Sequence, residues 1–243
     1  KTADLLRLFA VWAILKGHRL PDWEEFSLTP ERRIKGRFDE LSKIRKFRES
    51  IPDWLDDTGL SELGLLWEKE IHALNQPAGV ILRANTLKIE PGPLRTRLES
   101  EGIVTERIKG FPTALRLKER QNVFATNSFK EGLFEVQDAS SQLVAPFLAP
   151  QSGMRVIDAC AGAGGKSLHL ACLMENKGQI IALDIYPQKL HELKRRARRN
   201  GIHNIETRLV DSTKVTKKLR AKADKVLIDA PCSGLGVLRR NPD

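Results

Sequence analysis

The spacing of apolar residues predicts a helical segment at the beginning of the chain. Apolar side chains recur at helical intervals over 3–20 and 30–50, and again over 61–75, where Ser61 is the expected N-cap. The periodicity is lost at the Gln-Pro-Ala-Gly sequence that follows. Residues 1–76 are therefore expected to form a small helical unit.

A mixed pattern of strands and helix follows. Apolar and alternating runs predict strands over 80–86, 103–108, 114–117 and 133–138, and a proline-initiated run predicts a helix over 91–101. This order predicts a small α+β platform over residues 77–137. By analogy with other platforms of this kind, we expect an RNA-binding-like subdomain.

Strands and helices alternate from residue 138 onwards. Apolar strands are expected over 154–160, 178–185, 205–211 and 225–231, and helices over 139–148, 165–176, 187–201 and 212–223. Such alternation is typical of a parallel sheet covered by helices on both faces, the Rossmann-like α/β class. About four strands of such a sheet fit into residues 138–243. Ligands of these sheets bind at the carboxyl ends of the strands.

The charge of the chain is concentrated in its second part. The 243 residues carry a formal net charge of +10; residues 1–150 hold 23 Lys and Arg against 22 Asp and Glu, and residues 151–243 hold 18 against 9. Such an excess favours a polyanionic partner such as RNA, because phosphate contacts release counterions. One expected helix carries a basic cluster, either a solvated face or a phosphate contact: Lys194, Arg195, Arg196, Arg198 and Arg199.

Other features argue against membrane, secretory and metal-binding classes. No run reaches the roughly 18 apolar residues of a membrane-spanning helix, and the first residues lack the apolar region of a signal peptide. Cys160, Cys172 and Cys232 are too few and too scattered for a disulfide framework or a structural zinc site. We expect a cytoplasmic protein without a membrane span or a bound metal.

A glycine-rich bend follows the first strand of the expected parallel sheet. The sequence DACAGAGGKS begins at Asp158, and its three glycines within four residues let the backbone approach a ligand at the start of a helix. A nucleoside-triphosphate loop, GxxxxGK[ST], needs glycine where Cys160 stands, and a dinucleotide-binding GxGxxG needs glycine where Ser167 stands. The remaining interpretations are a site for S-adenosyl-methionine, which has no phosphates, or a tight turn without a ligand.

Each of the four expected strands ends near an aspartate. Asp184 lies about 20 residues beyond the glycines, where a carboxylate can accept hydrogen bonds from both ribose hydroxyls. Asp211 ends the third strand, within expected reach of an adenine edge. Together with Asp158 and Asp229, these side chains are expected to line one crevice, because the carboxyl ends of parallel strands meet at one edge of the sheet.

A Pro-Cys pair follows the fourth strand, in the sequence DAPCSG that begins at Asp229. Its position directs the Cys232 thiol into the expected crevice. Cytosine C5 is too weakly nucleophilic to take a methyl group directly, so a thiolate must first add to C6. Asp229 is the candidate acid for proton donation towards N3. The alternative is that Cys232 fills a small buried space.

These motifs resemble the Sun/Fmu/nucleolar-protein family of RNA cytosine-C5 methyltransferases. The resemblance rests on VQDASSQLVAPFL, VIDACAGAGGKS, LDIYPQKL and VLIDAPCSGLGVLRRNPD, with NTLK in the platform, and spans about Val80 to Asp243. It implies methylation of cytosine C5 in RNA, chiefly ribosomal RNA, from S-adenosyl-methionine through a covalent cysteine adduct. It also implies the donor-binding residues Cys160, Ala161, Gly162, Ala163, Gly164, Gly165, Lys166, Asp184, Asp211 and Asp229.

Two departures from the family pattern concern the bend and the cysteines. The family has a proline before the double glycine, in the region of Ala163 and Gly164, and this change is expected to leave donor binding intact. In the family the Pro-Cys thiol, here Cys232, is thought to assist breakdown of the adduct, and a later Thr-Cys supplies the attacking thiol. This sequence has no Thr-Cys. We expect that nucleophile beyond Asp243; the alternative is attack by Cys232 itself.

Two other functions are compatible with parts of the sequence. A non-catalytic RNA-binding or assembly protein with a degenerate methyltransferase fold would fit the missing Thr-Cys. An amine methyltransferase would need Asn/Asp-Pro-Pro-aromatic at the fourth strand, where Asp-Ala-Pro-Cys stands. Ribosomal and transfer RNA are both open as the substrate of the leading hypothesis.

Overall fold

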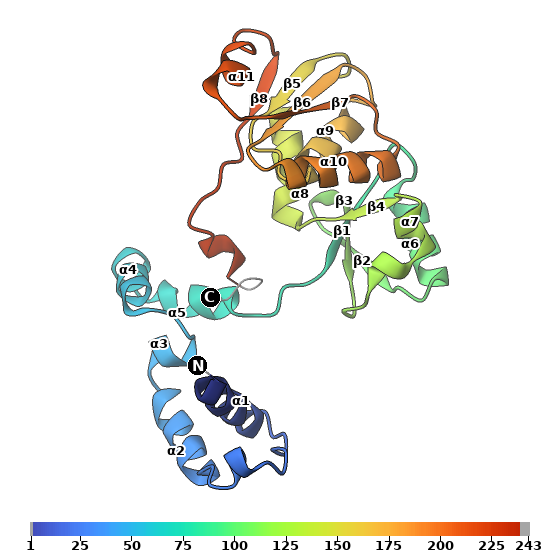
Figure 1. The fold of residues 1–243 in the computed structure, drawn as a ribbon. Coiled ribbons are helices and arrows are strands. Elements are labelled where there is room, and N and C mark those ends of the chain that lie inside the picture. The colour runs from blue at the N-terminus through green and yellow to red at the C-terminus, as the bar shows by residue number, and fades with distance from the viewer. Residues whose placement is uncertain (1, 239–243) are drawn as a thin grey trace. The chain divides into compact units, whose positions relative to one another are not determined.

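The computed structural model describes residues 2–238 and divides into two compact units (Figure 1). One unit is built from the residues up to Pro77 and those from Gly234 onwards, and the other from Ala78–Ser233. The division into segments 1–76, 77–137 and 138–243 stays a prediction. None of the helices within residues 2–238 combines the length and the apolar character that a bilayer span requires.

The first unit is helical, as expected, but its helices are shorter and more numerous. The single helix expected over 30–50 is wrong, because the backbone becomes extended at Ile44 and separates α2 from α3. The helix expected over 61–75 is also wrong, since Ser61 lies inside α4 and Gly64, with φ of +54°, ends that helix. The helices are α1 (Thr2–Leu15), α2 (Glu31–Leu41), α3 (Arg45–Arg48), α4 (Asp53–Leu63) and α5 (Leu66–Leu74), with a short 3-10 turn at Glu24–Phe26.

The second unit begins with the platform, a four-stranded antiparallel sheet. Its elements are β1 (Ile81–Ala84), α6 (Pro91–Ser100), β2 (Thr105–Ile108), β3 (Phe111–Leu117), the 3-10 turn Val123–Ala125, α7 (Asn127–Lys130) and β4 (Phe134–Val136). The strand order β2-β3-β1-β4 is that of a split β-α-β fold. The sequence predicted the four strands and α6 but not the short helix α7. Leu82, Leu98, Leu115 and Phe134 form its buried core.

The parallel sheet follows, in the order β7-β6-β5-β8, and confirms the expected fold class. The helix expected over 212–223 is wrong in extent, because only the first turns are helical. The elements are α8 (Ala139–Leu148), β5 (Arg155–Asp158), α9 (Gly165–Leu173), β6 (Gln179–Asp184), α10 (Pro187–Asn200), β7 (Ile205–Leu209), α11 (Thr213–Lys217) and β8 (Lys225–Leu227).

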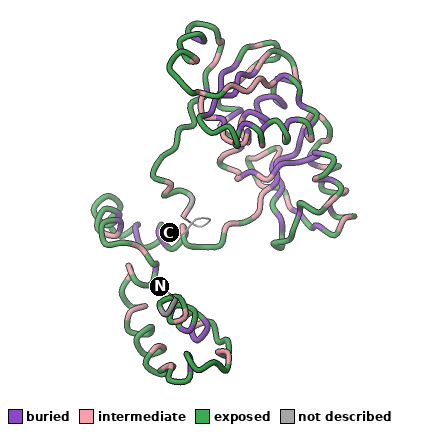
Figure 2. Tube along the Cα trace, viewed as in Figure 1, coloured by how far each residue is buried: buried purple, intermediate pink, exposed green. Residues whose placement is uncertain are grey.

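Helices cover both faces of this sheet. On one face α8, α9 and α10 enclose a core that includes Val156, Leu168 and Ile180. On the other face Ile157 and Leu183 pack against the region of α11. Figure 1 shows α9 and α10 between the parallel sheet and the platform. Figure 2 shows that most residues of β5, β6 and α9 are buried, and this core holds the ends of the two strands in place.

Candidate active site

The bend between β5 and α9 has a backbone conformation that favours glycine at two positions. Gly162 and Gly164 have φ of +54° and +88°, in the left-handed region. A Cβ atom on Gly164 would lie 2.6 Å from Cγ of Leu193 in α10. Any side chain at position 164 would therefore strain the bend. The absence of a Cβ lets the backbone of the bend pack directly against α10.

Asp184 ends β6, beside β5, and its carboxylate faces this bend. The residue is 8% exposed. Its Oδ2 accepts a hydrogen bond from the Gly162 amide at 2.8 Å, and its Oδ1 accepts one from the Tyr186 amide at 2.8 Å. Each oxygen keeps a further lone pair. The carboxylate is thus held by the backbone while it can still accept hydrogen bonds from the hydroxyls of a ligand.

Asp158 ends β5 and is almost fully buried beneath the bend. Its Oδ2 accepts a hydrogen bond from Ser167 Oγ at 2.6 Å. Burial raises the pKa of Asp158; hydrogen bonds from Ser167 and the Cys160 backbone oppose the rise, and the charge of Asp229 adds to it. Asp158 therefore ties the strand end to the first turn of α9.

A half-exposed ion pair lies at the other side of the bend. Lys166 Nζ in the first turn of α9 is 2.6 Å from Oδ2 of Asp229, which follows β8. The Lys166 and Asp229 side chains are 21% and 44% exposed. The pair links the bend to the segment that carries Cys232.

The three acidic strand ends that flank the bend converge on Cys160. This thiol is partly buried, and burial raises its pKa, with further increases from the negative charges of Asp158, Asp184 and Asp229. Cys160 is therefore a protonated thiol near neutral pH and lacks the thiolate character of a nucleophile.

Asp211 and Cys232 lie in solvent-exposed segments that follow β7 and β8. Asp211 is exposed beyond the end of β7, and its Oδ1 accepts a hydrogen bond from Ser212 Oγ at 3.1 Å. Cys232 is an exposed free thiol in the segment after β8. The alternative interpretation, in which Cys232 fills a small buried space, is therefore wrong. The adenine role of Asp211 and the catalytic role of Cys232 stay predictions.

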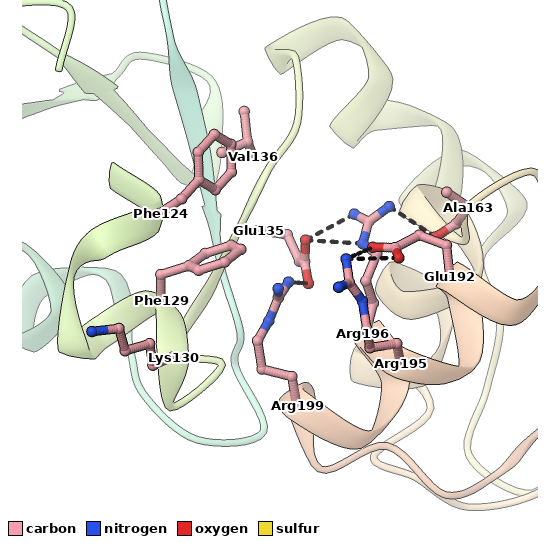
Figure 3. A pocket seen from close by; sticks show the side chains of 10 residues that line it. All are labelled: Phe124, Phe129, Lys130, Glu135, Val136, Ala163, Glu192, Arg195, Arg196 and Arg199. Atoms are coloured by element: carbon pink, nitrogen blue, oxygen red, sulfur yellow. Dashed lines mark hydrogen bonds and ion pairs between the residues drawn. The ribbon is translucent and has the colours of Figure 1, made fainter. Parts of the chain in front are cut away.

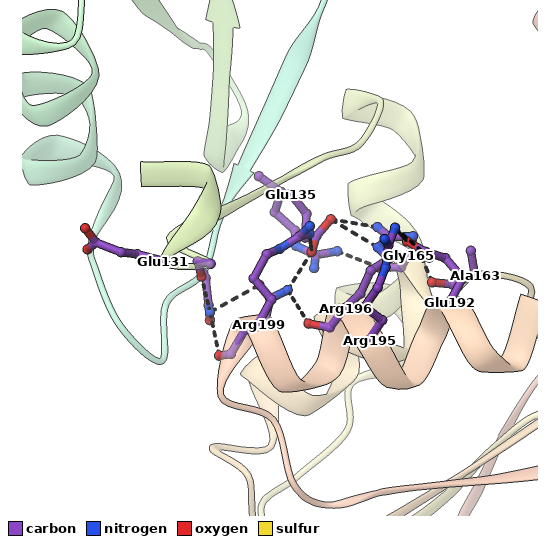
Figure 4. A network of polar contacts seen from close by, with 12 residues as sticks. Glu131, Glu135, Ala163, Gly165, Glu192, Arg195, Arg196 and Arg199 are labelled. Atoms are coloured by element: carbon purple, nitrogen blue, oxygen red, sulfur yellow. Dashed lines mark hydrogen bonds and ion pairs between the residues drawn. The ribbon is translucent and has the colours of Figure 1, made fainter. Parts of the chain in front are cut away.

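Sequence reasoning missed a polar network that holds the bend from outside (Figure 4). The carbonyl oxygen of Ala163 accepts a hydrogen bond from Arg196 Nη1 at 2.8 Å, and that of Gly165 accepts one from Arg83 Nη1 at 2.7 Å. Arg196 in turn pairs with Glu135 of β4 at 2.8 Å. Nothing in the local sequence marks Arg83 or Glu135 as buried, because both lie in platform strands that read as ordinary partly apolar runs.

Glu135 joins the platform to α10. Its carboxylate binds Arg196 and Arg199 and accepts a hydrogen bond from Asn200 Nδ2 at 2.5 Å. Burial alone would raise the pKa of Glu135, but the charges and hydrogen bonds of these partners outweigh it and lower the pKa. The two arginines are mostly buried, so the predicted solvated face is wrong for this part of α10.

A pocket of about 770 Å³ lies between the platform and α10 (Figure 3). It shares only Ala163 with the donor-binding residues implied by the sequence. The Phe124 and Phe129 rings form a T-shaped pair with centroids 5.0 Å apart, and the Arg199 guanidinium lies 3.8 Å from the centroid of the Phe129 ring. The pocket is lined by Phe124, Phe129, Lys130, Glu135, Val136, Ala163, Glu192, Arg195, Arg196 and Arg199.

Known proteins resemble this chain in both sequence and fold. The "Probable ribosomal RNA small subunit methyltransferase B" of Bacillus subtilis (strain 168) is 36% identical over 196 residues, which is 80% of this chain and 44% of that protein. The crystal structure of PH0851 covers 96% of this chain with 30% identity and a TM-score of 0.81, and 58% of its own chain is covered. A methyltransferase homolog from Pyrococcus horikoshii covers 81% with 31% identity and a TM-score of 0.72, and 64% of its own chain is covered.

Two family matches cover the last part of the helical unit, most of the platform and the parallel sheet. Residues 51–124 match the ferredoxin-like domain of the RsmF/B-like methyltransferases. Residues 145–243 match the family described as 16S rRNA methyltransferase RsmB/F. The chain spans less than half the length of the curated relatives that it matches. From these matches and the shared fold, the chain belongs to the RsmB/F methyltransferase family.

Proposed function

We propose that the chain binds S-adenosyl-methionine at the bend between β5 and α9 and directs its methyl group to C5 of a cytosine in RNA. The observation that carries the proposal is the buried Asp184 carboxylate, whose Oδ2 lies 2.8 Å from the Gly162 amide. The carboxylate can accept hydrogen bonds from ribose hydroxyls, and it lies beside a glycine bend that lacks the phosphate-loop sequence. The names of the relatives support small-subunit ribosomal RNA as the substrate.

The residues around the bend fit this donor. Nothing lies within 4 Å of the position that a Cβ of Gly162 would take, and Asp184 keeps lone pairs for the two ribose hydroxyls. We assign the methionine part to the bend from Cys160 to Lys166 and the adenine edge to Asp211. The bound donor supplies an electrophilic methyl group on a sulfonium sulfur. The acidic strand ends Asp158, Asp184 and Asp229 favour this cationic centre.

Cytosine must be activated before it accepts the methyl group. A thiolate adds to C6, which makes C5 enamine-like, and C5 then takes the methyl group as its bond to the donor sulfur breaks. A base removes the C5 proton, and the C6–sulfur bond breaks to return the thiolate. We assign to Asp229, which pairs with Lys166 at 2.6 Å, the role of the acid that assists this addition at N3. Since chemistry at C5 requires access to the ring, the base must leave its stack. The exposed Cys232 suits contact with such a base.

The donor site is tested by calorimetric titration of the 243-residue chain with S-adenosyl-methionine. Asp184→Ala should weaken binding about 100-fold, because two hydrogen bonds to a charged group are lost at about 1.5 kcal/mol each. Asp211→Ala, at an exposed position, should weaken it only a few-fold. Equal affinities of the wild type and Asp184→Ala would remove the donor-site assignment.

The cytosine chemistry is tested with RNA that contains 5-fluorocytidine. Fluorine replaces the C5 proton whose removal releases the thiolate, so the covalent adduct persists. An adduct on Cys232 in the wild-type chain, absent in Cys232→Ala, would assign attack to that thiol. Without such an adduct, Cys232 has at most the breakdown role. Mapping of 5-methylcytosine in ribosomal RNA from cells that lack the protein then separates an enzyme from a non-catalytic RNA-binding protein. Loss of a methylated position is expected for the enzyme, and an unchanged methylation map is expected for the binding protein.

A further inference from the structure

A side chain of the platform reaches into the bend of the parallel sheet. Arg83 belongs to β1 and is 1% exposed. Its Nη1 donates a hydrogen bond to the Gly165 carbonyl oxygen at 2.7 Å and another to Oε1 of Gln137. Gly165 is the first residue of α9, so Arg83 holds the start of the helix that carries Lys166 and Ser167.

The burial of this guanidinium is costly unless it has a specific task. Among residues 2–238 Arg83 forms no ion pair, and its Nε is buried without a partner. Burial lowers the pKa of Arg83 to about 10, so the group stays charged at neutral pH. An apolar side chain would fill such a position without the desolvation penalty. The main compensation visible for the charge is the pair of acceptors at Gln137 and the bend.

A second arginine holds another carbonyl of the bend, two residues before Gly165. Arg196 Nη1 donates to the Ala163 oxygen at 2.8 Å, and Arg196 is itself fixed by Glu135. Both carbonyls that flank the left-handed Gly164 are therefore held by arginines. Arg83 and Glu135 are also direct partners in the pairing of β1 with β4. One cross-strand pair of the platform thus supports both contacts. Arg83 bonds the Gly165 carbonyl directly, and Glu135 fixes Arg196, which bonds the Ala163 carbonyl.

We propose that Arg83 and Glu135 are positioning residues of the methyl-donor site, which hold the bend in the conformation that the donor requires. The platform is then a structural part of the donor site as well as a neighbouring subdomain. The inference rests on the proposed function, since it assumes that the donor binds at the bend. Neither residue contacts the donor; both act through backbone carbonyls.

The test compares Arg83→Met with Leu82→Val in the complete 243-residue chain. Leu82 precedes Arg83 in β1 but packs in the platform core, so its variant weakens that core without removing a contact to the bend. Two quantities are measured: the affinity for S-adenosyl-methionine by calorimetry, and the hydrogen exchange of the amides of residues 162–167 without ligand. Arg83→Met should lower the affinity and speed this exchange about tenfold each, the effect of one charge-assisted hydrogen bond. Leu82→Val should change neither by more than about twofold.

If Arg83→Met does not fold, Arg83→Lys replaces it. Its single ammonium cannot reproduce the planar fork, so both effects should be at least about threefold. The inference is overturned if the folded variant stays within twofold of the wild type in either quantity, because the coupling between bend and affinity would then be absent. If the wild type binds no donor, the proposed function fails. The exchange of residues 162–167 still decides whether Arg83 holds the bend.

Discussion

The two edges of the candidate site are held in different ways. On the side of β5 and β6, Asp158 and Asp184 are buried and their contacts are to backbone and to Ser167. On the side of β8, Asp229 is half exposed and the contact to the bend is one ion pair with Lys166. The first side has the rigidity that ligand binding requires, and the second has the access that a large substrate requires. Donor binding and methyl transfer should therefore respond to different substitutions.

The largest effect should come from Gly164→Ala, which acts on the buried side. An alanine in the left-handed conformation costs about 1 kcal/mol. Its Cβ would also clash with Leu193, and such overpacking costs about 2 kcal/mol more. We expect a loss of about 3 kcal/mol in the free energy of unfolding, measured by urea denaturation. Gly153→Ala is the matched control, because its φ is +91° and nothing lies within 4 Å of its Cβ. Equal losses in the two variants would show that α10 does not press on the bend.

The next effect is a pH dependence that only the buried side should have. Burial, with the charge of Arg83, lowers the pKa of His169 in α9 to about 3. Between this value and the ordinary value near 6.5, the unfolded chain binds the proton and the folded chain does not, so stability falls as the pH falls. The loss from pH 7 to pH 5 should be about 2 kcal/mol. In His169→Leu this part of the loss should vanish; an unchanged pH profile would contradict the assignment.

A smaller effect is expected on the open side. Lys166→Met removes the ion pair with Asp229, and because the aspartate is half exposed the loss of stability should be about 0.5 kcal/mol. Thermal unfolding in low and high salt would measure it, and salt should reduce the difference between wild type and variant. A loss above about 2 kcal/mol would mean that the pair supports the fold as strongly as the buried contacts do.

The smallest effect should follow Cys232→Ser. The thiol is exposed, so stability should change by less than about 0.5 kcal/mol, and the affinity for S-adenosyl-methionine should stay within twofold. Parallel denaturation and calorimetry would check both values. A marked loss of donor affinity would show that the Cys232 side chain itself contributes to donor binding, and the contrast between the two sides would then be smaller.

Local pattern was sufficient for some parts of this molecule. The parallel sheet was predictable because its strands are apolar and separated by amphipathic helices, and the strand-end aspartates were visible as single residues after those strands. The helix breaks near Ile44 and at Gly64 were missed, because amphipathic spacing continues across them. The extent of β8 was also overestimated, since its apolar run continues beyond Leu227 after pairing has ended.

The contacts that fix the bend were not predictable from local pattern. Arg83 lies 82 positions before Gly165, and Glu135 lies 61 positions before Arg196. No periodicity connects residues at such separations, and basic residues on a helix are usually solvated. Their partners became visible only when the platform packed against α10.

The carboxylate of Glu135 has a consequence for protein engineering. A piece of the chain that begins at residue 138 would lose Glu135, the shared counter-ion of Arg196 and Arg199, and would leave these two neighbouring guanidinium groups without it. The smallest transplantable piece therefore begins before β1 and keeps the platform.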